Sequence, residues 1–169
     1  MKNITVAGGG VLGSQIAFQT AFCGFNVKIW LRSNESIGRT QPKLDRLYGI
    51  YKQTLTQAKK ELGSGKVFPR GLITDSSKVN ESDIDKLLKA VERAYKEIKL
   101  TTSLEEACND ADLIIESMAE NPEAKIAFYK SLDPHLEEKT IVATNSSSMI
   151  PSPVSYTHLR AHETVLDLV

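Results

Sequence analysis

The chain has 169 residues, of which 41% are hydrophobic and 25% charged, and its 21 basic and 21 acidic side chains give a formal net charge of zero. This length suits one domain with a hydrophobic core, and the composition excludes fibrous and wholly disordered proteins. A neutral chain gives no electrostatic reason to expect nucleic acid or a membrane as partner, and no apolar run approaches the roughly 18 residues of a membrane span. The two cysteines lie in unrelated contexts, which favours reduced thiols and a cytoplasmic protein.

The N-terminal part of the chain has the pattern of a strand, a helix and a second strand. Residues 4–7 form a short apolar run that ends in glycines, which predicts a buried strand. Residues 12–22 carry apolar side chains at helical spacing, and Gly24 is a typical helix stop. Residues 27–31 alternate between apolar and more polar positions, so we expect a second strand and hence one βαβ unit.

Two long amphipathic helices are predicted next. Apolar residues recur every three or four positions over residues 44–62 and again over residues 84–98, with the second helix starting near Ser82. The glycine and proline residues of segment 63–71 predict a loop between them. We expect an antiparallel helical hairpin, whose apolar stripes are more typical of packing than of binding.

Alternating strands and helices then resume. Short strands are predicted at 100–102, 112–116 and 140–144, with a capping box at Ser103–Glu106 and a helix that starts at Pro122. Because the strands are continuous apolar runs separated by helices, the sheet should be parallel and covered on both faces. The expected fold class is α/β: a Rossmann-type, doubly wound parallel sheet with a helical hairpin insertion.

The glycine-rich segment after the first strand is the strongest functional signal. Gly8, Gly10 and Gly13 fit the spacing G-x-G-x-x-G, and the segment lies between a strand and a helix, as dinucleotide-binding sites require. Such glycines allow a tight turn, close approach of the backbone to a pyrophosphate, and close contact between helix and strand. The N–H groups of the helix start, which includes Val11 and Leu12, are expected to face the phosphates.

The end of the second strand departs from the usual pattern of NAD-binding sites. An Asp or Glu usually stands there to bind the ribose hydroxyls, but this chain has Leu31 and Arg32, and its first carboxylate is Glu35. An arginine at this point can accept a 2′-phosphate, which would favour NADP. The alternative is that Arg32 is solvated and that the ribose is held by the backbone or by Glu35. NAD with NADP as the alternative is therefore the cofactor prediction.

Polar side chains also follow the last two predicted strands. Glu120 and Lys125 come after the strand at 112–116, and Asn145 and Ser147 come after the strand at 140–144. Open α/β sheets bind ligands at this edge, where amide and hydroxyl groups can hydrogen-bond a nicotinamide or a substrate oxygen. The simpler interpretations are a solvated charge pair at a helix start and an ordinary turn.

Three segments in this order, ITVAGGGVLGSQIA, LTTSLEEACNDADLIIESMAENPEAK and TIVATNSSSMIPS, resemble the cofactor domain of the L-3-hydroxyacyl-CoA dehydrogenases, including 3-hydroxybutyryl-CoA dehydrogenases. The resemblance covers about residues 1–152 and implies oxidation of the 3-hydroxyl of an acyl-CoA, with NAD as hydride acceptor. It implies that Glu120 and Lys125 contact the cofactor, that Ser147 binds the substrate's 3-oxygen, and that Asn145 supports that site. The family's acidic ribose ligand aligns at or beside Leu31.

The C-terminal segment departs from the family. The resemblance implies a catalytic histidine in an H-F-x-N segment at an offset that falls near Leu168; His158 and His162 do not stand in that motif and receive no catalytic role. Residues 153–169 are similar to translated adapter sequence, so we expect an artefactual tail on a dinucleotide-binding domain of residues 1–152. The family's C-terminal helical domain, which supplies much of the substrate cleft and the homodimer interface, is expected to be missing.

The predicted function is thus that of an oxidoreductase of fatty acid metabolism which transfers hydride between a 3-hydroxyacyl-CoA and NAD, with no metal. This chain itself is expected to bind cofactor without turnover. Two alternatives stay open. One is a non-catalytic dinucleotide-binding module, and the other is an NADP-linked dehydrogenase of a small hydroxy acid or sugar phosphate.

Overall fold

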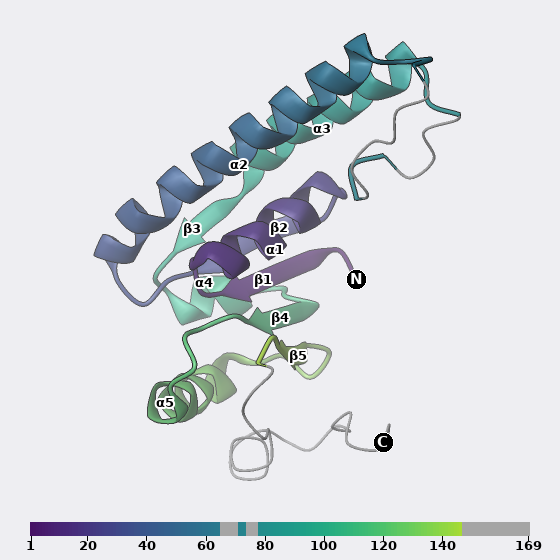
Figure 1. Ribbon diagram of the computed structural model, residues 1–169. Helices are drawn as coiled ribbons and strands as arrows, with labels where there is room; N and C mark the ends of the chain where they lie inside the picture. Colours follow the sequence, from purple (N-terminus) through teal and green to yellow (C-terminus); the bar gives the residue numbers. More distant parts are fainter. Residues whose placement is uncertain (65–70, 74–77, 147–169) are drawn as a thin grey trace, which may run out of the picture.

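The fold is a parallel sheet with helices on both faces (Figure 1). The computed structural model describes residues 1–64, 71–73 and 78–146. These residues form a five-stranded sheet of order β3-β2-β1-β4-β5, in which every neighbouring pair is parallel. The strands are β1 (Asn3–Ala7), β2 (Asn26–Trp30), β3 (Lys99–Thr101), β4 (Leu113–Glu116) and β5 (Ile141–Thr144). The predicted strands and the doubly wound topology are confirmed.

The helices divide between the two faces of the sheet. On one face lie α1 (Val11–Phe22), α2 (Asn34–Lys60) and α3 (Glu81–Glu97). On the other lie α4 (Leu104–Cys108), α5 (Pro122–Leu132) and the 3₁₀ turn η1 (Asp133–His135). None of the described helices is long and apolar enough to cross a membrane.

Each face of the sheet has its own hydrophobic core. Phe18, Ile29 and Leu55 are fully buried between the sheet, α1 and the two long helices. On the opposite face, Trp30 packs its ring 5.0 Å from that of Phe128. Successive side chains of a strand point to opposite faces. The alternating residues of β2 therefore contribute to both cores, as the sequence predicts.

The helical hairpin is part of the first core. Helices α2 and α3 lie side by side and both contact α1. The rings of Tyr48 and Tyr95 stack 4.6 Å apart, and Tyr51 meets Phe18 edge to face at 4.9 Å. This confirms the packing interpretation of the two stripes. Helix α2 begins at Asn34, well before the apolar stripe that predicted it, and accommodates Pro42.

The predicted capping box of α4 forms only in part. Ser103 Oγ accepts from the N–H of Glu106 at 3.2 Å, but the N–H of Ser103 donates to Thr101 Oγ1. The Glu106 carboxylate accepts from the same Thr101 hydroxyl instead of closing the box. Thr101 takes the reciprocal role, which the spacing of Ser103 and Glu106 cannot reveal.

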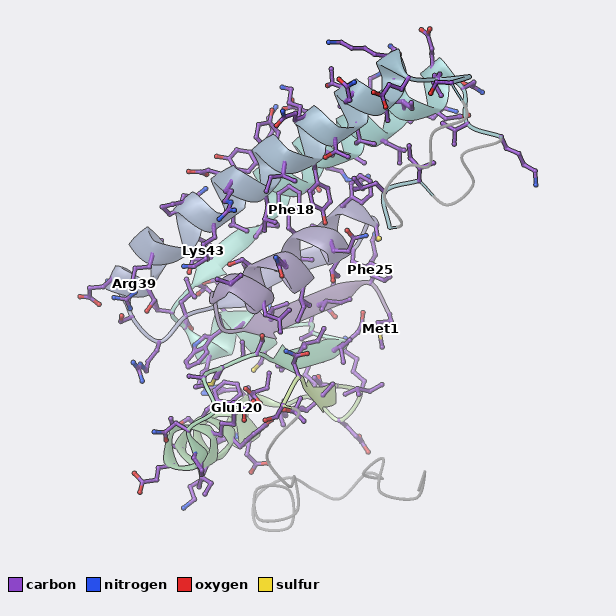
Figure 2. All side chains as sticks on the ribbon, in the orientation of Figure 1. Met1, Phe18, Phe25, Arg39, Lys43 and Glu120 are labelled. Atoms are coloured by element: carbon purple, nitrogen blue, oxygen red, sulfur yellow. The ribbon has the colours of Figure 1, made fainter. Side chains whose placement is uncertain are left out.

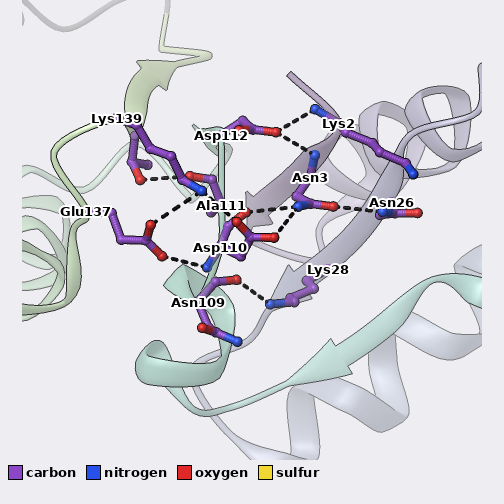
Figure 3. A network of polar contacts seen from close by, with 11 residues as sticks. Lys2, Asn3, Asn26, Lys28, Asn109, Asp110, Ala111, Asp112, Glu137 and Lys139 are labelled. Carbon is purple, nitrogen blue, oxygen red and sulfur yellow. Dashed lines mark hydrogen bonds and ion pairs between the residues drawn. The ribbon is translucent and has the colours of Figure 1, made fainter.

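A polar network joins the strands at their amino ends (Figure 3). Asp112 lies just before β4. Its carboxylate accepts from the backbone N–H of Asn3 at 2.9 Å and from the backbone N–H of Lys2. The Asn3 side chain in turn bonds Asp110 at 2.7 Å and Asn26 at 2.7 Å, and Lys139 pairs with Asp110. These contacts hold the starts of β1, β2 and β4 in register.

We predict that Asp112→Asn lowers stability in a pH-dependent way. The backbone N–H groups of Asn3 and Lys2 hold the pKa of Asp112 below its usual range. A depressed pKa contributes stability above the unfolded-state value, and this contribution is lost as the pH falls through the folded-state value. Urea midpoints should therefore differ between the two proteins at pH 7 and converge in acid. A difference that persists in acid would contradict this role.

Candidate functional site

The glycine turn after β1 brings the ends of β1 and β4 together. Gly8 has φ +123°, and a Cβ there would strike the carbonyl oxygen of Ser117 in the loop after β4. A Cβ on Gly13 would strike the carbonyl oxygen of Gly8 itself. Both positions therefore require glycine, one for its backbone conformation and both for lack of room.

The start of α1 is open to a ligand. Gly10 is the N-cap, and a Cβ added to it would meet no atom within 4 Å. The helix has no side-chain cap and no acidic residue in its first turn, and Val11 and Leu12 are 68% and 51% exposed. A helix start of this kind attracts anions through its N–H groups and the helix dipole. The turn therefore suits a pyrophosphate.

The corner between β2 and α2 places Leu31 and Arg32 differently. Leu31 is 3% exposed and packs against Gly9, so its side chain belongs to the core and offers nothing to a ligand. Arg32 is exposed. On the first turns of α2, Arg39 Nη2 donates to Ser36 Oγ at 2.9 Å. Figure 2 labels Arg39 at this end of the helix, while Met1 lies toward the opposite edge of the sheet.

Sequence reasoning missed the hydroxyls at this corner. Ser33 is the N-cap of α2, and its Oγ lies 3.3 Å from that of Ser36. The spacing of Ser33, Ser36 and Arg39 at intervals of three was the available signal, since such residues share one side of a helix.

The end of β4 holds a buried ion pair. Glu116 is fully buried, and its Oε2 lies 3.0 Å from Nζ of Lys125, which is itself 3% exposed. Lys125 therefore does not belong to a solvated charge pair; it extends from α5 inward to the strand end. Ion pairs buried to this degree need further hydrogen bonds to offset desolvation.

Those further bonds come from neighbouring elements. Glu116 Oε2 accepts from Thr144 Oγ1 at 2.7 Å and, more weakly, from Tyr129 Oη at 3.5 Å, while Oε1 accepts from the N–H of Met118 at 2.7 Å. Burial, and then the nearby Glu116 carboxylate, raise the pKa of the Tyr129 hydroxyl, which keeps it a donor. Sequence reasoning named none of these groups; a lone acidic residue ending an apolar strand was the signal for Glu116.

Lys125 also connects to the end of β5. Its Nζ donates to Ser146 Oγ at 2.9 Å, and Ser146 Oγ donates to the Glu120 carboxylate at 2.7 Å. Glu120 Oε1 is 3.6 Å from Lys125 Nζ, and its side chain is 44% exposed. The structure thus brings the predicted pair Glu120 and Lys125 together at the carboxyl edge, with Ser146 between them.

The remaining predicted residues lie at or beyond the end of the described chain. Asn145 is exposed, and its N–H donates to the Glu116 carbonyl at 2.8 Å. Ser147, His158, His162 and the tail of residues 153–169 lie outside the described residues. In the described ranges, no group of His, Cys, Asp and Glu side chains could hold a metal ion.

A doubly wound sheet, an open glycine turn at a helix start and polar groups at the next two strand ends define a dinucleotide-binding domain of the Rossmann class. Residues 3–166 match the family model described as 3-hydroxyacyl-CoA dehydrogenase, NAD binding domain. The chain belongs to this family. The resemblance found in the sequence and the assignment of NAD are confirmed.

Individual relatives agree with this assignment. The chain is 30% identical over 149 residues to the probable 3-hydroxybutyryl-CoA dehydrogenase of Bacillus subtilis, covering 88% of this chain and 42% of that protein. It is 26% identical to the mitochondrial hydroxyacyl-coenzyme A dehydrogenase of Sus scrofa, with 88% and 40% covered. The chain thus spans less than half the length of these relatives.

Solved structures share the fold. A diketoreductase, described as acting on dicarbonyl compounds, is 31% identical with a TM-score of 0.68, covering 92% of this chain and 45% of that one. The 3-hydroxybutyryl-CoA dehydrogenase of Escherichia coli K12 has a TM-score of 0.62 at 22% identity, with 93% and 27% covered.

We predict opposite effects for two alanine substitutions in the glycine turn. Gly10→Ala has room and a compatible φ of −66°, so the unfolding free energy should change by less than about 1 kcal/mol. Its methyl group should occupy the ligand's space and weaken NADH binding about tenfold or more. Gly13→Ala should instead lose about 1–3 kcal/mol of stability through its clash with Gly8.

Urea unfolding and NADH titration of both variants test this contrast. An unstable Gly10→Ala, or a Gly13→Ala as stable as the wild type, would show that the turn has been assigned wrongly.

Proposed function

We propose that this chain is the cofactor-binding part of a 3-hydroxyacyl-CoA dehydrogenase, which transfers hydride between the 3-hydroxyl carbon of a 3-hydroxyacyl-CoA and NAD. One observation carries the proposal: the open glycine turn and the Lys125–Ser146–Glu120 group lie at the same edge of the sheet. The tight contact of Gly8 with Ser117 makes these two parts of the edge neighbours. A dinucleotide binds across the carboxyl ends of the strands on both sides of such a glycine turn.

The residues present fit the cofactor. The N–H groups at the start of α1 would hold the pyrophosphate, since Gly10 leaves open space there. Lys125, Glu120 and Ser146 would hold the nicotinamide half, because they follow the strands on the other side of β1. When bound, NAD supplies the acceptor for the hydride.

The chain's own part in catalysis would be to bind and orient. Glu120 would accept from ribose hydroxyls, and Lys125 would present a fixed positive charge beside them. Ser147 is proposed to orient the substrate's 3-oxygen and Asn145 to support it, as the family resemblance implies. The N–H of Asn145 already ties this segment to Glu116.

The wider assignments are proposals of the same kind. The acyl-CoA substrate, a role in fatty acid metabolism and a homodimeric parent follow from the family resemblance. The proposed cytoplasmic location instead rests on the two cysteines, which are free thiols. The domain boundary near residue 152 and the artefactual tail likewise stay predictions.

Preference for NADP is a second candidate for the cofactor, and the β2–α2 corner is the observation that favours it. Arg32 is exposed, and Leu31 stands where NAD-binding sites usually have a carboxylate. On the adjoining helix α2, Arg39 donates to Ser36. An arginine at this point can accommodate a 2′-phosphate.

We predict that the purified chain binds NADH and does not measurably oxidise 3-hydroxybutyryl-CoA with NAD. Fluorescence titration with NADH and NADPH, on the wild type and on Arg32→Ala, measures binding and preference together. We expect NADH to bind at least as tightly as NADPH and Arg32→Ala to leave NADH affinity within about twofold, because a solvated arginine contributes little.

Three results would change the account. A loss of NADPH affinity in Arg32→Ala, from a wild type that prefers NADPH, would support the NADP-linked alternative. Turnover by the purified chain would contradict the assignment of a cofactor-binding part alone. Binding without turnover in a full-length protein that carries this segment would favour the non-catalytic module.

A further inference from the structure

Glu116 is the most deeply buried charged side chain described at the proposed site, and no step of the proposed function uses it. It ends a strand that is otherwise apolar, and its side chain is 1% exposed. Placing a carboxylate there is strongly unfavourable, because the charge loses its hydration unless partners replace the water. A group with that cost is expected to have a role.

The partners of Glu116 come from three separate segments that surround the site. Met118 belongs to the loop after β4, Lys125 to α5, and Thr144 to the end of β5. The backbone carbonyl of Glu116 also accepts from Asn145. One residue thereby joins the two strand-end loops that would flank the nicotinamide half of a dinucleotide.

The strongest of these contacts fixes Lys125. A lysine side chain has four rotatable bonds and normally keeps its ammonium group in water. Here Nζ is held between Glu116 Oε2 at 3.0 Å and Ser146 Oγ at 2.9 Å, with Glu120 at 3.6 Å. Without the buried carboxylate, the ammonium group would lose its closest anion and turn toward Glu120 and solvent.

We propose that Glu116 is a positioning residue of the cofactor site. Its carboxylate holds Lys125 Nζ, and through it Ser146 and Glu120, in the arrangement that binds the nicotinamide half. The proposal rests on the proposed function. It separates two halves of the cofactor, because the carbonyl oxygens of Ser117 and Gly8 confine the glycine turn. The Glu116 side chain contacts this loop at the N–H of Met118 and holds Lys125 on the other half.

The test compares two ligands on the full 169-residue chain. ADP probes the glycine turn and the adenosine half, and NADH probes both halves. For Glu116→Gln we expect NADH affinity to fall about tenfold or more, the loss typical of one charged hydrogen bond, while ADP affinity stays within about twofold. Calorimetric titration measures both, and Glu138→Gln, an exposed carboxylate before β5, is the matched control.

A double-mutant cycle shows whether Glu116 acts through Lys125. We expect Glu116→Gln combined with Lys125→Met to bind NADH no more weakly than Lys125→Met alone. A merely structural role would not produce this non-additivity. It would lower NADH and ADP affinity together, in proportion to the unfolded fraction.

Thr144→Val provides a second route should Glu116→Gln not fold. It removes a hydroxyl that donates to Glu116 and accepts from the N–H of Ser146, and it keeps both charges. We expect it to weaken NADH binding and to spare ADP.

Several outcomes would overturn the proposal: unchanged NADH affinity in folded Glu116→Gln or Thr144→Val, equal losses for both ligands, or an additive double mutant. A wild type that binds neither ligand would instead refute the proposed function, and this inference with it. A wild type that binds both, with a Glu116→Gln that also binds both normally, refutes this inference alone.

Discussion

The buried ion pair between Glu116 and Lys125 is the interaction on which the carboxyl edge of the sheet depends. Glu116 gathers its donors from the loop after β4, from α5 and from the end of β5. Opposite charges buried together cost less than either alone, so each partner requires the other. The pair therefore fixes where α5 begins relative to the sheet, and with it the position of Glu120.

The two edges of the sheet have different functions. At the amino edge, Asp112, Asn3 and their partners form an exposed network that aligns the strands. At the carboxyl edge, the charged pair Glu116–Lys125 is buried, and the glycine turn leaves open space at Gly10. This asymmetry is the general property of open α/β sheets, in which ligands bind where the strands end.

Apolar periodicity, together with the glycine and proline residues that end helices and strands, predicted the fold closely. Apolar runs located β1, β4 and β5, because buried parallel strands are apolar on both faces, and alternation located β2. Gly8, Gly10 and Gly13 fell in the expected strand–turn–helix context. The sequence could not predict how deeply each charged side chain is buried. Glu120 and Lys125 look alike as charged residues near a helix start, yet one is partly exposed and the other buried beside Glu116. Thr144, Ser146 and Tyr129 join the network only through the fold, since nothing in their local spacing connects them.

The most direct test of the account is an amide NMR titration of this chain with ADP and with NADH. We predict that ADP shifts the amide signals of the glycine turn, Gly8–Gly13. NADH should shift these signals and also those of residues 117–125 and 144–146, because the second half of the ligand lies beside Lys125. Shifts confined to the amino edge around Asn3 and Asp112, or identical shifts with both ligands, would contradict the account.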